Sequence, residues 1–202
     1  MKLVTWNVNS LGARMPRLLE FLETQAPDIA CLQETKVADK AFPSLAFSAL
    51  GYESAHFGQG QWNGVAILSR VGIDDVVADF ADGAGPDPDA RILSATCGGI
   101  RTMSVYVPNG RAVGTEHYER KLVWLGLLRD WVAAKFTPDD AVVVLGDFNV
   151  APSDTDVWDP KAFVGSTHVT EPERAAVRAL CEWGMVDVFR QCYDGIDRLY
   201  TY

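Results

Sequence analysis

The most constraining feature of this sequence is the apolar stretch Ala141–Leu145, which runs through Gly146 into Asp147 and Asn149. Five consecutive apolar residues, three of them valine, favour a buried strand. In an extended chain, side chains two positions apart point the same way, so Asp147 and Asn149 are expected to face one site while Phe148 points into the core. The stretch is therefore interpreted as a rigid support for polar side chains at the rim of a sheet.

Two earlier segments end in the same manner. Lys2–Val8 alternates as a strand does and contains Asn7, and the apolar strand Ile29–Leu32 runs into Glu34. Strands that alternate with helices tend to lie parallel, and ligands bind beyond the carboxyl ends of such strands. Asn7, Glu34 and Asp147 are therefore expected to converge.

Hydrophobic periodicity and turn residues predict the other elements. Helices are predicted over Pro16–Gln25, Ala41–Leu50, Glu116–Phe136 and Glu171–Trp183, and further strands over Tyr52–Phe57, Val65–Ser69, Val76–Phe80, Ile92–Cys97 and Thr102–Val107. Asp82–Asp89 is predicted to be a loop. The mixture indicates the α/β class, with two packed mixed β-sheets flanked by helices in a four-layer α/β sandwich. The length of 202 residues suits one core, so 1–202 is interpreted as a single domain.

Composition narrows the possible functions. The sequence has 18 Lys and Arg against 27 Asp and Glu, a net charge of −9, which disfavours a non-specific nucleic-acid binder because phosphate contacts need cations. A divalent metal can supply positive charge locally. No stretch approaches the roughly 18 apolar residues of a membrane helix, and the N-terminus lacks a signal-peptide pattern. We therefore expect a cytoplasmic protein that has no membrane partner, and no obligate protein partner is evident.

The residue types at the strand ends indicate which metal they would bind. Carboxylate and amide oxygens are hard ligands that suit Mg²⁺ or Mn²⁺, and the four cysteines include no Cys-x-x-Cys pair that would favour zinc. Glu34 is the first candidate ligand, with Asn7 and Asp147 beside it. The alternative is that these residues are strand-end caps and turn formers, which Asp and Asn commonly are. Cys31 is expected to be a buried free thiol.

Six motifs occur in an order that resembles the exonuclease III family of DNA repair nucleases, within the endonuclease/exonuclease/phosphatase superfamily. They are LVTWNVNSL, PDIACLQETK, GVAILSR, YVPNG, VVVLGDFNVAPSDTD and WGMVDVFR. The segments LQETK and GDFNVAP are the most specific. The resemblance implies a phosphodiesterase dependent on Mg²⁺ (or Mn²⁺) in base excision repair. Its implied partner is duplex DNA with abasic sites or 3′ ends.

The resemblance also implies roles for individual positions. Asn7 and Glu34 match residues of the metal site. Asp147 matches the aspartate that orients or deprotonates the attacking water, and it is also placed with the metal ligands. Asn149 matches an asparagine that donates a hydrogen bond to the scissile phosphate, and Tyr106 matches a tyrosine that approaches the same phosphate. Without the resemblance, Tyr106 is better interpreted as an ordinary strand aromatic.

Two further positions are implied to contact the substrate. Arg91 resembles a DNA-backbone contact, and Asn109 stands where some members have a glutamine that can serve a phosphate oxygen. Five basic residues lie near the motifs in sequence: Lys36, Arg91, Arg111, Arg120 and Lys121. They could form a basic face on the protein or be scattered surface charges, and the sequence favours neither interpretation. Three histidines lie outside the motifs and are expected to be surface or loop residues: His56, His117 and His168.

The sequence departs from the family at its end. The family continues into an arginine-isoleucine-aspartate strand and a serine-aspartate-histidine turn, whereas this sequence ends in DRLYTY and has no Asp-His pair. The C-terminal strands are therefore expected to be missing and the domain to be incomplete. Two alternatives remain open: a phosphoesterase of the same fold acting on lipid, inositol phosphate or RNA, and a DNA-binding remnant without turnover.

Overall fold

The chain forms two compact units. The computed structural model describes residues 1–80, 89–193, 195–196 and 199–201. The first unit comprises Met1–Tyr106 and Ala141–Phe148, and the second comprises Val107–Asp140 and Asn149–Tyr202. The predicted loop Asp82–Asp89 lies outside the described residues, apart from Asp89 itself. The expectation of one domain over 1–202 stays a prediction.

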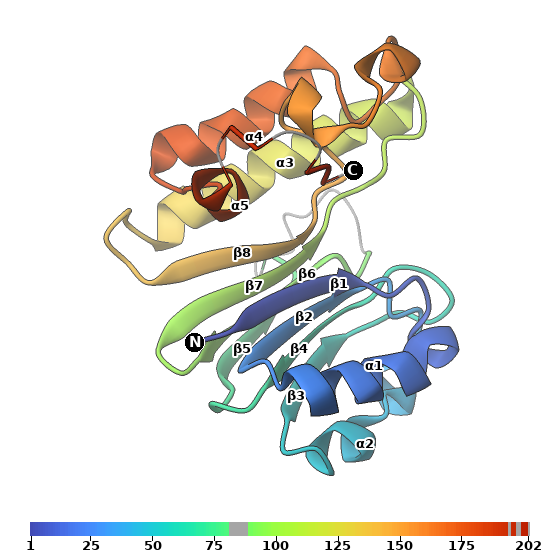
Figure 1. The fold of residues 1–202 in the computed structure, drawn as a ribbon, viewed down its shortest axis with the longest axis vertical. Helices are drawn as coiled ribbons and strands as arrows, with labels where there is room; N and C mark the ends of the chain where they lie inside the picture. Colours follow the sequence, from blue (N-terminus) through green and yellow to red (C-terminus); the bar gives the residue numbers. More distant parts are fainter. Residues whose placement is uncertain (81–88, 194, 197–198, 202) are drawn as a thin grey trace. The chain divides into compact units, whose positions relative to one another are not determined.

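The first unit contains two four-stranded mixed sheets (Figure 1). The first sheet has the order β1 (Leu3–Asn7), β2 (Ile29–Gln33), β4 (Val65–Ser69), β3 (Glu53–Phe57). The second has the order β5 (Asp74–Ala78), β6 (Ile92–Cys97), β7 (Ile100–Tyr106), β8 (Val142–Asp147). The pairs β1–β2 and β7–β8 are parallel and the others antiparallel. Consequently β1, β2, β7 and β8 each deliver a carboxyl end to the rim of its sheet.

Helix α1 (Leu11–Gln25) begins before the predicted start at Pro16, which lies inside it. The reason is the side chain of Ser10, which accepts a hydrogen bond from the Ala13 amide at 3.4 Å and so caps the helix. Helix α2 (Ser44–Ser48) is shorter than predicted. It follows the 3₁₀ turn η1 (Asp39–Ala41), and the extended residue Phe42 separates them because a residue before proline avoids helical geometry.

The two sheets pack face to face through apolar side chains. Ile29, Cys31 and Ile67 of the first sheet belong to the same buried cluster as Leu93 and Ala95 of the second. The opposite face of the first sheet packs under α1 and α2 (Figure 1). Strands β2 and β4 are thus covered on both faces, which explains why their sequences are apolar without alternation. The α/β class with two mixed sheets and flanking helices is confirmed.

The strand predictions differ from the structure mainly at the edges of the second sheet. Strand β5 is Asp74–Ala78 rather than Val76–Phe80, and its pairing with β6 shifts register within the strand. Strand β8 was expected to be buried, but its residues are half-buried because, among the described strands, it pairs with β7 alone. Cys31 is a buried free thiol, as expected.

The second unit is built on two packed helices, α3 (Glu116–Lys135) and α4 (Glu171–Trp183), which lie side by side in Figure 1. Both agree with their predicted ranges to within one residue. The unit also contains three short elements: η2 (Asp154–Asp156), η3 (Pro160–Phe163) and α5 (Val188–Cys192). Within the described ranges, no helix is long and apolar enough to cross a membrane.

Candidate active site

Three of the predicted ligands meet at the carboxyl ends of the strands of the first unit. Asn7 is the last residue of β1, Asp147 is the last residue of β8, and Glu34 directly follows β2. The parallel register places Asn7 opposite Gln33, so Glu34 emerges one residue beyond the same end of the sheet. The convergence that parallel strands predict is therefore present.

One amide connects the two carboxylates. The Asn7 Nδ2 group donates to Glu34 Oε1 and to Asp147 Oδ2, each at 2.8 Å. The amide oxygen of Asn7 accepts from the main-chain N–H of Asn9 at 3.0 Å. Asn7 thus faces the carboxylates with its N–H group, and it holds two like charges next to each other.

Glu34 is stabilised in its ionised form. Burial by itself would raise the pKa of its carboxyl, but the pKa lies below the ordinary value. Hydrogen bonds from Asn7, Lys36 and Tyr106 lower it, and so does the positive charge of Lys36. Lys36 Nζ lies 2.9 Å from Glu34 Oε2 and 2.5 Å from Asn9 Oδ1. The Glu34 carboxylate is therefore charged and fixed in position at neutral pH, as an oxygen ligand for a metal would need to be.

Tyr106 and Arg91 complete this cluster. Tyr106 is the register partner of Asp147 at the end of β7. Burial, the charge of Glu34 and the hydrogen bond to Glu34 raise the pKa of its hydroxyl well above the ordinary value. Its ring lies 4.9 Å from the Arg91 guanidinium carbon, a cation–π contact, and Arg91 pairs with Asp89 at 3.1 Å. Tyr106 therefore remains a protonated donor.

The donor set fits a hard divalent cation. Among the described residues, no group of three or more His, Cys, Asp and Glu side chains is arranged to hold a metal. The cluster instead offers the carboxylates of Glu34 and Asp147, which share the Asn7 amide. Mg²⁺ commonly takes one or two protein carboxylates and completes its shell with water and substrate phosphate. A site with two carboxylates and no sulfur ligand matches that preference.

Asn149 and Asn109 belong to the second unit and bond to each other. Asn149 is only 7% exposed; its Nδ2 donates to the Val107 carbonyl at 2.9 Å, and its Oδ1 accepts from Asn109 Nδ2 at 3.3 Å. The expectation that Asn149 follows Asp147 in extended backbone is wrong, because Asn149 has φ 50 and lies in the left-handed region. Phe148 between them is half-buried.

Lys121 is not a surface cation. It lies in α3 with a fully buried side chain, and its Nζ pairs with the equally buried Glu173 of α4. Burial by itself would raise the pKa of the Glu173 carboxyl, but four hydrogen bonds hold it at about 2. Their donors are Lys121, Thr167, Thr170 and the main chain of His168. A basic face therefore cannot include Lys121, which instead supports the loops that carry the two asparagines.

One histidine prediction also needs correction. His117 is exposed, and His168 is buried but lies in the loop before α4, so both agree with the expectation of surface or loop residues. His56 does not, because it belongs to β3 and its side chain is only 5% exposed. The His56 ring stacks on Phe42 and lies 2.9 Å from the hydroxyl of Thr35, the residue after Glu34. It therefore braces the loop that carries Glu34. No sequence motif marks either position, because the contacts come from distant segments.

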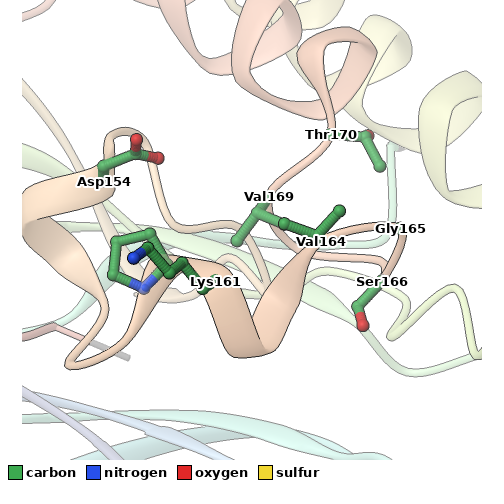
Figure 2. Close-up of a pocket in the computed structure, with 8 residues that line it drawn as sticks. Asp154, Lys161, Val164, Gly165, Ser166, Val169 and Thr170 are labelled. Carbon is green, nitrogen blue, oxygen red and sulfur yellow. The ribbon is translucent and has the colours of Figure 1, made fainter.

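A shallow pocket in the second unit contains none of the predicted site residues. Figure 2 shows its lining, which comes from η2, η3 and the loop that precedes α4. The residues are Asp154, Pro160, Lys161, Val164, Gly165, Ser166, Val169 and Thr170. It has one carboxylate and one ammonium group, so the chemistry of the chain is better sought at the strand ends.

Comparisons with known proteins agree with the motifs. The sequence pattern of the Endonuclease/Exonuclease/phosphatase family matches residues 4–201. Exodeoxyribonuclease III from Haemophilus influenzae is 30% identical over 202 residues, which cover 95% of this chain and 75% of that protein. An AP endonuclease from Archaeoglobus fulgidus superposes with a TM-score of 0.91 at 34% identity, over 95% of this chain and 74% of that one. The 3′ phosphatase NExo from Neisseria, solved with a product DNA hairpin, gives 0.90 at 36% identity over the same shares.

Proposed function

Because the chain belongs to the exonuclease III and AP endonuclease branch of the endonuclease/exonuclease/phosphatase family, we propose that it is a metal-dependent DNA phosphodiesterase. It would cleave duplex DNA at abasic sites and degrade or clean 3′ ends, and its cellular context is base excision repair. The observation that carries the proposal is the pair of carboxylates, Glu34 and Asp147, joined by Asn7 at the strand ends.

Glu34 and Asp147 are the residues that would hold Mg²⁺ or Mn²⁺. Such an ion, when bound, polarises a phosphate oxygen and neutralises developing charge. Asn7 orients the two carboxylates by donating to one oxygen of each, and Lys36 fixes the other oxygen of Glu34. Asp147 is also the proposed acceptor of a proton from the attacking water, the role that its match to the family's aspartate implies.

Hydrogen-bond donors would stabilise the phosphate. Tyr106 stays protonated because its pKa is raised, so its hydroxyl can turn from Glu34 to donate to a phosphate oxygen throughout the physiological pH range. The amides of Asn149 and Asn109 are fixed by their mutual hydrogen bond and by Val107. Donors that are already oriented stabilise charge without reorganising during the reaction. Arg91, held against the Tyr106 ring, would contact the DNA backbone.

Support for DNA as the substrate comes from relatives rather than from net charge. The Neisseria enzyme, at 36% identity, was solved with product DNA, and the Haemophilus relative is an exodeoxyribonuclease. This chain carries a net charge of −9, so its phosphate contacts depend on local cations. Lys36 and Arg91 in the first unit are such cations beside the carboxylates.

The test compares Glu34→Gln with the parent chain on an abasic-site duplex, a 3′-phosphate duplex, an RNA tail and an inositol phosphate, at a series of Mg²⁺ concentrations. Glu34→Gln is expected to lower the DNA cleavage rate and to raise the Mg²⁺ concentration needed. Glu182→Gln, at an exposed position of α4, is the matched control. Cleavage that persists in chelator would contradict the metal site. Faster turnover of RNA or inositol phosphate would move the chain to another substrate class, and binding of DNA without cleavage would make it a binding protein.

A further inference from the structure

The buried side chain of Lys121 contacts the main chain of both candidate phosphate-binding asparagines. Its Nζ lies 2.6 Å from the Asn149 carbonyl oxygen and 3.3 Å from the Asn109 carbonyl oxygen. It also contacts Glu173 Oε1, and Thr167 Oγ1 at 3.3 Å. One ammonium group therefore links two loops that are 40 residues apart in the sequence.

Counting protons shows which of these contacts are hydrogen bonds. An ammonium group has three N–H donors; one goes to Asn149, one to Glu173, and the third is shared by the two acceptors at 3.3 Å. His168 Nδ1 lies 2.6 Å from the Asn149 carbonyl oxygen, so that nitrogen carries a proton and donates to it. The Asn149 carbonyl thus accepts two hydrogen bonds, one from Lys121 and one from His168.

The main-chain contacts determine where the amides point. Asn149 has φ 50, and its side chain bonds to Val107 and Asn109 within the same unit. Asn109 is followed by Gly110, where a Cβ would come within 3.0 Å of Lys121 Cδ. The loop therefore passes close to the lysine at Gly110. A shift of Lys121 would be transmitted directly to both asparagines.

The pairing of charges does not by itself explain a lysine here. Buried ion pairs can often be replaced by apolar residues of similar volume without loss of stability. An apolar residue at position 121, however, would remove two contacts. The buried carbonyl oxygen of Asn149 would lose one of its two hydrogen-bond donors, and the carbonyl oxygen of Asn109 would lose its contact with the ammonium group. Glu173 neutralises the ammonium, and its other oxygen accepts from Thr170 at the start of α4. The carboxylate thus anchors the lysine, and the lysine holds the loops.

We propose that Lys121 is a positioning residue for the reaction: it holds the carbonyls of Asn109 and Asn149 so that their side-chain amides are set to receive a phosphate. The inference rests on the proposed function, and Lys121 itself touches no substrate. Displacement of a reacting group by about 1 Å can cost about 100-fold in rate. We expect loss of Lys121 to lower kcat by about 10- to 100-fold, with a smaller change in KM.

The experiment uses the full chain and a double variant, Lys121→Met/Glu173→Gln, which removes both buried charges and keeps the volume. Glu173→Gln alone keeps the lysine donors, Lys121→Arg tests conservative rescue, and Lys135→Met is the same substitution at an exposed position of α3. Three quantities are measured: the side-chain amide resonances of Asn109 and Asn149, kcat and KM on an abasic-site duplex, and the Mg²⁺ concentration for half-maximal rate.

The double variant is expected to shift both amide resonances and to lower kcat, while its Mg²⁺ requirement stays that of the parent chain. Glu173→Gln, Lys121→Arg and Lys135→Met are expected to keep both resonances. A folded double variant with unshifted resonances, or with the kcat of Glu173→Gln, overturns the proposal. If the double variant does not fold, folded Lys121→Met replaces it: unshifted amide resonances in that variant overturn the proposal, and shifted resonances support it. If no variant cleaves DNA, the resonances still decide the positioning role, and only the proposed function fails.

Discussion

Each unit of the molecule contains a lysine–carboxylate pair next to candidate site asparagines, and the two arrangements differ in burial and charge. In the first unit, Asn7 joins two carboxylates, and Lys36 pairs with one of them at a half-buried position. In the second, Lys121 and Glu173 form a fully buried pair of opposite charges. The first cluster holds two carboxylates on one amide, an arrangement that an added cation would stabilise. The second is neutral and complete without a ligand.

This difference matches the proposed roles, a reacting site in the first unit and a supporting site in the second. Like charges held close destabilise a fold unless a ligand compensates, which is a common feature of catalytic centres. A balanced buried pair whose hydrogen bonds are satisfied instead makes the structure around it rigid. Changes in the first cluster should therefore affect rate more than stability, and changes in the second should affect stability first.

The largest effect is expected for Asp147→Asn. It removes the proposed proton acceptor while keeping the shape and the hydrogen bond to Asn7, so the cleavage rate should fall by about 10²- to 10⁴-fold. The dissociation constant for an abasic-site duplex should change little, because the duplex is held elsewhere. Single-turnover kinetics and equilibrium binding measure the two quantities. Asp139→Asn, at an exposed position, serves as the control; an equal loss of binding and rate in Asp147→Asn would contradict the assignment.

The next effect is on stability. Lys121→Met leaves Glu173 charged and unpaired in the interior, which should lower the free energy of unfolding by about 3–5 kcal/mol. Glu34→Gln, measured without metal, should change it by about 1 kcal/mol or less, because the exposed part of its pair with Lys36 is screened by water. Urea denaturation of both variants gives the comparison. Similar losses in the two would show that the clusters do not differ as described.

A smaller effect is expected on the stability of the protein at low pH. The pKa of Glu173 is lowered from 4.5 to about 2 in the folded chain, so its contribution to stability is complete above pH 4.5 and is lost as the pH falls towards 2. The pKa of Glu34 is lowered too, so it acts in the same direction. Denaturation midpoints between pH 6 and 2 should therefore fall less in Glu173→Gln than in the parent chain. An unchanged pH profile in that variant would assign acid sensitivity to other carboxyls.

The smallest effect is expected for Gly110→Ala. Gly110 has φ +85, and an added Cβ would lie 2.9 Å from Thr167 Oγ1 and 3.0 Å from Lys121 Cδ. The left-handed conformation costs a non-glycine residue about 1–2 kcal/mol, so the melting temperature should fall by a few degrees. Gly165→Ala is the control: Gly165 also has a positive φ, +78, but a Cβ added there would have no atom within 4 Å. A larger fall in melting temperature for Gly110→Ala than for Gly165→Ala would show that the loop is tightly packed against Lys121, and equal falls would contradict it.

The parts of the fold that were predictable from sequence are those with local or periodic causes. The apolar strands β2 and β4 and the long helices α3 and α4 follow from hydrophobic pattern and capping. The convergence of Asn7, Glu34 and Asp147 followed from parallel strand ends, because that geometry places residues far apart in sequence at one rim. The start of α1 was missed because Ser10, rather than Pro16, caps it.

Other features depend on contacts that no local pattern marks. Lys121 has no distinguishing neighbours in sequence, and its burial results from the approach of three separate segments carrying Asn149, Thr167 and Glu173. A charged residue near a motif is ordinarily exposed, so the interpretation as a surface cation was wrong. The left-handed backbone of Asn149 likewise depends on its surroundings. The roles of the site residues in catalysis stay predictions.

The two hydrogen bonds of Asn7 span very different lengths of chain, 27 residues to Glu34 and 140 residues to Asp147. The first lies within a local strand–helix–strand unit, β1–α1–β2, that can close early during folding. The second requires β8 to reach the sheets from far downstream, and such long closures come late. One carboxylate is therefore expected to be in place before the other. The proposed metal-binding pair would be complete only after β8 has joined the first unit, so a partly folded chain is expected to lack that site.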